Sequence, residues 1–330
     1  MTSSQSVVAL SIVIPFYNEE EGVEEVIRRT IESCKRTGES FEVIAVNDGS
    51  RDGTLARLIS LSEKHPQLRI LNLWRNFGHM PALTAGLTHT TGQAVVVLDG
   101  DLQDPPELIG SLVEEWKRGA DVAYGKRTDS KDVGLKKAGS SMFYWLMGLV
   151  SEIDIPKNVG TYSLMTREVV DMISAMPEKC RFFTGIRAWV GGKQVEVSYC
   201  REQRRHGSSR VGLRGLVRLA RGALISFSGK PLRYISAFAF LASFILLLVG
   251  MVAIAIRLFT DLAIPGWATF TTLQGFLGCV LSFVLAIFAE YISVIFEEVK
   301  GRPVFLIREE YRVGTPHAPS QKRGHTVVPL

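Results

Sequence analysis

Cysteine is scarce in this chain of 330 residues, which contains four. Cys34, Cys180, Cys200 and Cys279 have neither the spacing of a disulfide framework nor the paired spacing of a zinc site. This excludes a small disulfide-stapled domain. It is typical of reduced cytosolic thiols, most of which we expect to be buried.

Several motifs are absent as well. No G-x-G-x-x-G follows the first apolar run, and no G-x-x-x-x-G-K-[ST] occurs anywhere, so dinucleotide oxidoreductases and P-loop nucleotidases lose their main support. The chain has no serine nucleophile elbow and no metalloprotease helix. The N-terminus lacks a basic leader and a small-residue cleavage site, so we expect its apolar run to be a strand and not a signal peptide.

Charge is scarce in one region. The whole chain is 46% hydrophobic and 22% charged with a net charge of +5, a balance that excludes a disordered chain, but Tyr234–Ile256 and Leu262–Ala289 carry no charge. At about 1.5 Å of rise per residue, each run is long enough to cross a bilayer core, and two runs are too few for a many-span transporter. The short linker Arg257–Pro265 predicts a hairpin of membrane helices at about 234–256 and 264–290. The positive-inside rule places the N-terminal domain and the C-terminal tail in the cytosol.

Short apolar runs alternate with helical patterns along the first third of the chain. The predicted strands are Val7–Pro15, Phe41–Val46, Leu68–Leu73, Ala94–Leu98 and Asp121–Tyr124, and the predicted helices are about Glu20–Arg36, Asp52–Lys64, Met80–Thr90 and Pro106–Arg118. This alternation predicts a layered α/β domain with parallel strands and right-handed crossovers. Asp104-Pro105-Pro106 is typical of a helix N-cap followed by proline in the first turn.

A polar cluster follows each predicted strand. The clusters are Pro15–Glu20, Asn47–Gly53, Arg75–Gly78, Asp99–Gln103 and Gly125–Arg127. Ligands of an open parallel sheet bind at the carboxyl ends of its strands. One such cluster could be a helix cap, but five together favour a single shared site.

Asp99-Gly100-Asp101 is the sharpest of these signals. Two carboxylates flanking a glycine at a buried strand end can hold Mg²⁺ or Mn²⁺, with substrate phosphates in the remaining coordination positions. Gln103 can add a contact through its amide oxygen. The alternative is that Asp101 or Asp104 only caps the next helix, because an isolated Asp-x-Asp is a weak motif.

Asp48 and Tyr17 point to a nucleotide. Asp48 can accept hydrogen bonds from a nucleobase or a ribose, and Tyr17 can stack on a base. The alternatives are that Ser50 or Asp52 begins the following helix as a cap, and that Tyr17 is a half-buried loop aromatic.

Basic residues crowd into 201–233, just before the first uncharged run. Beside a membrane span, anionic lipid headgroups or phosphate ligands are more natural partners for such a segment than nucleic acid. A solvated flank without a ligand is the alternative.

Taken together, Ile14–Glu19, Val46–Ser50, Arg75–Gly78 and Leu98–Pro106 resemble, in order and spacing, the family 2 inverting glycosyltransferases. Arg204–Arg210 is similar to the Arg-x-x-Gly-x-Ser-Lys segment of the polyprenyl-phosphate branch, and the two-span C-terminus most resembles its bactoprenol glucosyltransferases. The resemblance covers nearly the whole chain. It implies a glycosyltransferase-A fold (an α/β, Rossmann-like, mostly parallel sheet) as a cytosolic catalytic domain over 1–210. A basic amphipathic segment over 211–232, two transmembrane helices within 233–296 and a cytosolic tail over 297–330 would follow.

The same resemblance implies roles for individual residues. The nucleotide sugar would be bound by Pro15, Tyr17, Asn18, Glu19, Asp48, Asp99, Gly100, Asp101 and Gln103, and the metal by Asp99, Asp101 and Gln103. The acceptor phosphate would be bound by Arg127, Lys136, Ser140, Arg204, Ser209 and Arg210. The catalytic set would be Asp99, Asp101, Arg127, Arg204 and Asp154. The family often has arginine in place of Lys136, and lysine cannot grip a phosphate bidentately.

The implied activity is inverting transfer of one hexose, with glucose from UDP-glucose favoured, to the phosphate of undecaprenyl or another polyprenyl phosphate, with Mg²⁺ or Mn²⁺ as cofactor. GDP-mannose, a UDP-N-acetylhexosamine or an aminoarabinose nucleotide are alternative donors. A catalytically inactive lipid-binding scaffold is an alternative of another class. The implied setting is a multi-pass protein of the bacterial cytoplasmic membrane, without a nucleic-acid partner and forming a small homo-oligomer.

Overall fold

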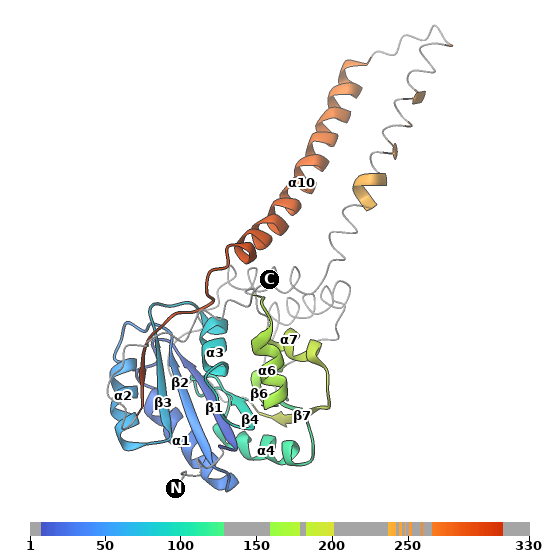
Figure 1. Cartoon of the computed structure of the whole chain (residues 1–330). Coiled ribbons are helices and arrows are strands. Elements are labelled where there is room, and N and C mark those ends of the chain that lie inside the picture. The colour runs from blue at the N-terminus through green and yellow to red at the C-terminus, as the bar shows by residue number, and fades with distance from the viewer. Residues whose placement is uncertain are drawn as a thin grey trace.

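The computed structural model describes residues 8–128, 159–178, 183–200 and 266–312, with scattered residues between 237 and 259. Its strands are β1 (Leu10–Phe16), β2 (Phe41–Asn47), β3 (Leu68–Leu73), β4 (Ala94–Val97), β5 (Val122–Arg127), β6 (Val159–Thr166), β7 (Gln194–Tyr199) and β8 (Ile307–Tyr311). Its helices are α1 (Val23–Thr37), α2 (Thr54–Lys64), α3 (His79–Leu87), the 3-10 turn η1 (Pro106–Leu108), α4 (Ile109–Lys117), α6 (Arg167–Ala175), α7 (Phe183–Val190) and α10 (Trp267–Val299). Figure 1 shows an α/β body from which α10 projects.

The eight strands form one sheet in the order β7-β5-β6-β4-β1-β2-β3-β8. The pairs β1–β2, β1–β4, β2–β3 and β5–β7 are parallel, whereas β6 is antiparallel to β4 and β5, and β8 is antiparallel to β3. The sheet is therefore mixed and mostly parallel. The carboxyl ends of β1 to β5 lie along one edge, called the carboxyl edge below.

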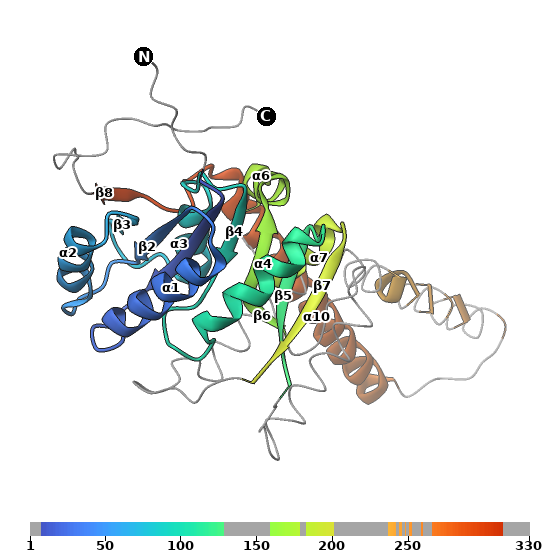
Figure 2. The same ribbon diagram turned by 90° about the horizontal axis from the view of Figure 1, so that it is seen from below.

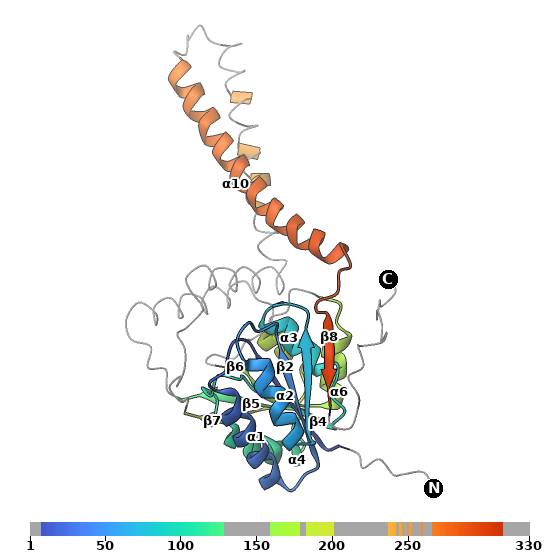
Figure 3. The same ribbon diagram turned by 90° about the vertical axis from the view of Figure 1, so that its left-hand side faces the viewer.

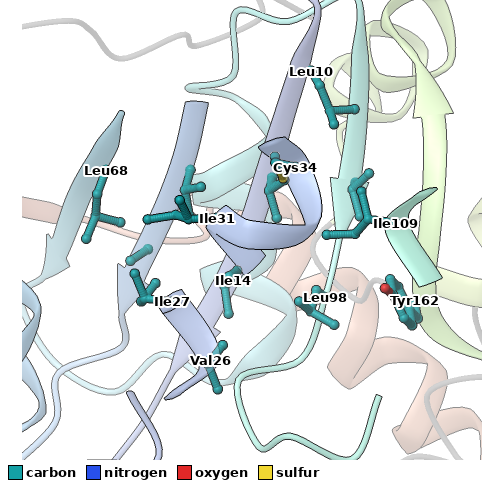
Figure 4. Packing of buried hydrophobic residues seen from close by; sticks show 14 of the residues in the cluster. Leu10, Ile14, Val26, Ile27, Ile31, Cys34, Leu68, Leu98, Ile109 and Tyr162 are labelled. Carbon is teal, nitrogen blue, oxygen red and sulfur yellow. The ribbon is translucent and has the colours of Figure 1, made fainter. Parts of the chain in front are cut away.

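Two apolar clusters cover the two faces of this sheet. Ile12 and Ile14 of β1 face a cluster that also contains residues of α1, α2 and α4 (Figure 4). Val13, between them, faces a second cluster with residues of α3, α6 and α7. Alternate side chains of a strand point to opposite faces, so a strand covered on both faces is apolar at every position. Figure 2 shows α1 and α4 on one face of the resulting three-layer arrangement.

The five predicted strands and four predicted helical segments are confirmed, with ends that shift by one to three residues. β3 has the predicted bounds, and the fourth segment consists of η1 followed by α4. The prediction that Asp104 is a helix N-cap is wrong. The cap position of η1 is Pro105, and the buried Asp104 carboxylate accepts a hydrogen bond from Tyr199 Oη instead.

Helix α10 is 33 residues long and projects away from the body as one continuous helix (Figures 1 and 3). Within the described part of the chain, it contains one segment long and apolar enough to cross a membrane, Leu273–Val299. Its large apolar side chains face outward, and Phe283 is 64% exposed. The helix thus runs nine residues beyond the predicted end near 290. The predicted partner helix at 234–256 lies mostly outside the described residues, so the hairpin stays a prediction.

The chain returns to the body directly after α10. β8 pairs with β3 so that Ile307 lies opposite Leu73, and the Trp74 N–H donates to the Leu306 carbonyl at 3.0 Å. Arg69 of β3 also bridges Glu310 of β8 at 2.9 Å. The segment predicted as a tail therefore supplies an edge strand. It enters the sheet at the carboxyl edge, because Leu73 is the last residue of β3.

Candidate active site

Two glycines allow the loops at the carboxyl edge to touch. Gly49, after β2, has a φ of +62°, and a Cβ atom there would overlap the Arg75 backbone after β3. A Cβ atom on Gly100, after β4, would stand 2.8 Å from the Phe16 ring and from the Pro15 carbonyl oxygen. Only glycine fits such approaches. The clusters predicted from separate strand ends therefore lie against one another.

Hydrogen bonds fasten the loop after β1 to the loop after β2. The Asn18 N–H donates to Ser50 Oγ at 3.0 Å, and the Glu19 N–H donates to Thr54 Oγ1 at 3.0 Å. In return, the Arg51 N–H donates to Asn18 Oδ1 at 2.8 Å. Asn18 has a φ of 52°, which asparagine tolerates better than most residues. The loops after β1 and β2 are therefore held together at the carboxyl edge.

Asp48, in the loop after β2, is a buried carboxylate with 2% of its surface exposed. Its Oδ1 accepts the Phe77 N–H at 2.7 Å, and its Oδ2 accepts the Gly78 N–H at 2.9 Å. Burial raises the pKa of Asp48, and the two N–H donors offset only part of that rise. Asp48 therefore anchors the loop after β3, and its predicted contact with a nucleotide stays a prediction.

Asp99 is held from two sides. His79 Nε2 lies 2.9 Å from its Oδ1, and Thr161 Oγ1 donates to the same oxygen at 3.0 Å. Desolvation alone would raise the pKa of Asp99, but the hydrogen bond and charge of His79, and then the bond from Thr161, lower it. Asp99 is thus an anion at neutral pH. Both of these bonds are made by Oδ1 and neither by Oδ2.

A single turn joins the two carboxylates. Phe77 and Gly78 bind Asp48 through their backbone, and the next residue, His79, binds Asp99 through its imidazole. The turn is possible because Gly78 has a φ of +104°. The turn from Phe77 to His79 therefore contacts both carboxylates.

The loop from Asp99 to Gln103 can hold a divalent cation. Asp101 is half-buried, and its Oδ1 accepts the Gln103 N–H at 3.2 Å. Leu102, between them, has a φ of 59°, a strained value for leucine and typical of functional loops. In the residues that the structure describes, no three His, Cys, Asp or Glu side chains converge as a metal cage. Two carboxylates with hard oxygen donors nevertheless fit Mg²⁺ or Mn²⁺, which take further ligands from phosphates and water.

Arg127, at the end of β5, is held in place by side chains of the body. Its Nε donates to Tyr199 Oη at 3.2 Å, and its Nη2 lies 3.8 Å from Asp104 Oδ1. Its side chain is 25% exposed. Burial alone would lower the pKa of Arg127, but the nearby negative charge of Asp104 raises it. The guanidinium is thus a fixed positive charge on the side of the edge next to Asp99.

The structure thus places the described site residues along one edge, in adjoining loops. Pro15 is buried at the end of β1, Tyr17 is half-buried in the following loop, and Gly100 is buried against Phe16. Six other predicted site residues lie outside the described residues, namely Lys136, Ser140, Asp154, Arg204, Ser209 and Arg210. The individual roles of all these residues stay predictions.

Sequence reasoning missed His79 and Thr161. His79 directly follows the Arg75–Gly78 motif, so its place after a strand end was a usable signal. Thr161 is the third residue of β6, a strand that is antiparallel to its neighbours β4 and β5, and no local pattern marks it as a partner of Asp99.

Known proteins similar to this chain include relatives that match it over most of its length. Residues 11–173 match the family model for glycosyl transferase family 2. The bactoprenol glucosyl transferase of Shigella phage SfII is 38% identical over 311 residues, which is 93% of this chain and 99% of that protein. An uncharacterised glycosyltransferase of Bacillus subtilis (strain 168) is 38% identical over 304 residues, 92% of this chain and 94% of that protein. Among solved structures, a mannosyltransferase from Pyrobaculum calidifontis, in complex with GDP-Man and Mn²⁺, is similar with a TM-score of 0.46 and 17% identity over 89% of this chain and 88% of that one.

In open α/β sheets of this kind, ligands bind at the carboxyl edge, where the acidic loops of this chain lie. The extent and identity of the sequence matches make the assignment specific. The chain belongs to glycosyltransferase family 2, and it is a glycosyltransferase.

Proposed function

We propose that the enzyme transfers one hexose, glucose from UDP-glucose, to the phosphate of a polyprenyl phosphate with inversion at the anomeric carbon. The observation that carries this proposal is the pair of carboxylates Asp48 and Asp99, joined by one turn at the carboxyl edge. The names of relatives at 38% and 39% identity, bactoprenol glucosyl transferases, support the acceptor and the sugar.

The donor would lie across the loops after β1, β2 and β4. Asp99 and Asp101, with Gln103 beside them, would hold Mg²⁺ or Mn²⁺. When bound, the cation neutralises the charge that grows on the departing diphosphate. His79 and Thr161 keep Asp99 in place through Oδ1. Asp48 accepts hydrogen bonds from the turn that carries His79. The proposed nucleotide-binding residue Asp48 and the proposed metal ligand Asp99 are therefore held by the same turn.

The acceptor needs positioning more than activation. A phosphate monoester is largely ionised at neutral pH and is already a nucleophile, so the site does not need a strong general base. Its requirement is a cation that holds a second anion beside the diphosphate. Arg127 meets it, because its guanidinium is fixed by Tyr199 and Asp104 close to Asp99.

The direction in which α10 meets the body supports a membrane-bound acceptor. The chain enters β8 at the carboxyl edge only eight residues after the end of α10, so the site lies on the side of the body nearest to this helix (Figure 3). If α10 crosses a bilayer, the site faces the headgroup layer, where a polyprenyl phosphate presents its phosphate.

The same connection supports a second membrane crossing. The body and β8 share one sheet and therefore lie on one side of the membrane. If α10 crosses, its beginning at Trp267 lies on the other side, and the chain between 200 and 266 must cross once more. The uncharged run Tyr234–Ile256 is the segment suited to this crossing. We propose this hairpin, with body and tail cytosolic, and a homo-oligomer stays a prediction.

A donor panel tests the proposed reaction. The full-length protein in detergent would be mixed with a short polyprenyl phosphate and Mg²⁺ or Mn²⁺. It would then receive, in turn, UDP-glucose, GDP-mannose, UDP-N-acetylglucosamine or an aminoarabinose nucleotide. We expect UDP-glucose to give the fastest formation of polyprenyl-phosphate hexose. Faster transfer from another donor would overturn the sugar assignment, and no transfer from any donor would favour the inactive scaffold.

A matched pair of carboxylate variants makes the panel specific to the site. Asp99→Asn should reduce turnover by more than about 100-fold, since it removes a charge required next to the diphosphate. Asp171→Asn changes an exposed carboxylate on α6 and should leave turnover within about twofold of the parent. Near-normal turnover in Asp99→Asn would remove the metal assignment.

A further inference from the structure

Arg187 is a buried cation that the proposed mechanism does not use. It lies in α7, which packs beside α6, and 1% of its surface is exposed. Its Nη1 lies 3.5 Å from the Gly160 carbonyl oxygen, at the limit of a hydrogen bond, and its guanidinium carbon is 4.8 Å from the centre of the Tyr124 ring. Its Nε has no hydrogen-bond partner. A guanidinium has five N–H donors, so most of its capacity is unused.

No acidic partner balances this charge in the part of the chain that the structure describes. By contrast, Arg69 of β3, whose side chain is 11% exposed, is bracketed by Glu42 and Glu310 at 2.7 and 2.9 Å. At Arg187 the described residues provide a carbonyl oxygen and an aromatic ring only. Burial lowers the pKa of Arg187 to about 10, so the side chain still carries its charge at neutral pH. Burying an unpaired cation is costly, and a structural position would be filled better by an apolar side chain of similar size.

The location of Arg187 connects this charge to the site. Gly160 precedes Thr161, whose hydroxyl donates to Asp99. On its other side, Gly160 is approached by Arg127, whose Nη2 stands 2.6 Å from where a Cβ atom of residue 160 would lie. Arg127 bonds Tyr199 of the apolar cluster on one face of the sheet, whereas Arg187 lies over Tyr124 of the cluster on the other face. Arg187 is therefore one residue from the partner of Asp99, with β6 between it and Arg127.

We propose that Arg187 binds a phosphate group of a substrate at the start of β6, beside the strand that carries Thr161. The proposal rests on the proposed function, in which two phosphate-bearing substrates meet at this edge. A guanidinium suits that task because it can donate two parallel N–H bonds to one phosphate, which an ammonium group cannot do. The acceptor monophosphate and the donor diphosphate share this chemistry, and the experiment separates them.

The experiment measures thermal stabilisation of the full-length protein in detergent by two probes, farnesyl phosphate and UDP with Mg²⁺, with farnesol as the uncharged control. The variants are Arg187→Met, Arg187→Lys and, as a matched control, Arg167→Met. Arg167 is a partly buried arginine of α6 that binds the Gly92 carbonyl oxygen away from the site. We expect Arg187→Met without probe to melt no lower than the parent, since an unpaired buried charge is removed. We expect Arg167→Met to melt lower and to keep both probe shifts.

Loss of the farnesyl phosphate shift in Arg187→Met would assign Arg187 to the acceptor, and loss of the UDP shift would assign it to the donor diphosphate. Either loss supports the proposal, and the KM for that substrate should then rise by at least tenfold, with partial recovery in Arg187→Lys. Shifts equal to those of the parent for both probes in Arg187→Met would overturn it. If Arg187→Met does not fold, Arg187→Lys with unchanged shifts and KM decides against the proposal. Binding is read without turnover, so a failure here is distinct from a failure of the donor panel.

Discussion

The α/β body and helix α10 use the same kinds of apolar side chain in opposite surroundings. Ile12 and Val96 of the body are fully buried, whereas Phe283 and Ile292 of α10 are 64% and 61% exposed. Exposed apolar patches of this length are rare on soluble proteins and mark a surface that meets lipid or another protein. The apolar side chains of the body are covered by the body itself, whereas those of α10 are not covered by it. β8 connects the two regions, because it follows α10 directly and pairs with β3.

The largest expected effect comes from placing charge in α10. Leu281→Arg combined with Leu285→Arg should raise the free energy of membrane insertion by about 6 kcal/mol, since each arginine costs about 3 kcal/mol more than leucine. The measurement is the fraction of protein that stays in the membrane pellet after alkaline carbonate extraction. The control changes both residues to isoleucine. Retention equal to the control would mean that α10 does not lie in lipid. The exposed apolar side chains of α10 would then need another explanation.

The same truncation in the two regions should have unequal effects. Ile12→Ala leaves a cavity between β1 and α1 and should lower the free energy of unfolding of the body by about 2–5 kcal/mol. Ile292→Ala removes a side chain that packs on nothing in the body and should change this free energy by less than about 0.5 kcal/mol. Pulse proteolysis in increasing urea, on protein in detergent, measures both. Equal losses would show that α10 is part of the folded core.

Acid should weaken the body through a buried ion pair. Glu42 accepts bonds from Ser11, Thr91 and Arg69, and these donors lower its pKa against the opposing effect of burial. Because the folded pKa lies below the unfolded one, this stability is present above the unfolded pKa, near pH 4.3, and is lost as pH falls through the folded value. Glu42→Gln should cost about 1–3 kcal/mol at pH 7.

The pH profile distinguishes this pair from general acid unfolding. Urea unfolding of the body between pH 7 and pH 3 should show a shallower acid loss in Glu42→Gln than in the parent. An unchanged slope would mean that Glu42 has the same pKa in both states.

The smallest effect is expected at the junction of the two regions. Glu310→Gln removes the partly exposed bond from β8 to Arg69, while Glu42 still pairs with that arginine. The expected loss is less than about 1 kcal/mol by the same urea assay. A loss above about 2 kcal/mol would show that β8 holds the body together, and the two regions would then not be independent.

Local patterns predicted the parts of this fold that local physics decides. β4 is a continuous apolar run because helices cover both faces, so it could be found from composition alone. β8 could not be found in this way. Its sequence Ile307–Tyr311 is mostly charged, and its partner β3 is more than 230 residues away in the chain. An edge strand needs little apolar content, so its pairing is set by tertiary contacts.

In the candidate site, too, some residues could be found from local patterns, whereas others are placed by tertiary contacts. Asp48 and Asp99 could be identified because each follows a recognisable strand. The place of Asp104 could not, because an Asp-Pro-Pro sequence predicts a cap while the tertiary structure offers Tyr199 and Arg127 as partners. Likewise, the support of Asp99 by Thr161 depends on a strand that runs against its neighbours, which sequence periodicity does not reveal.

The central claim is that the body delivers a sugar to a phosphate held at a membrane. The most direct test offers the full-length protein in liposomes UDP-glucose and two matched lipids, a polyprenyl phosphate and the corresponding polyprenol. Products are identified by mass spectrometry and by ³¹P NMR. We expect a polyprenyl-phosphate hexose of inverted anomeric configuration from the phosphate and no transfer to the alcohol. Equal transfer to both lipids, or a product that retains the donor configuration, would contradict it.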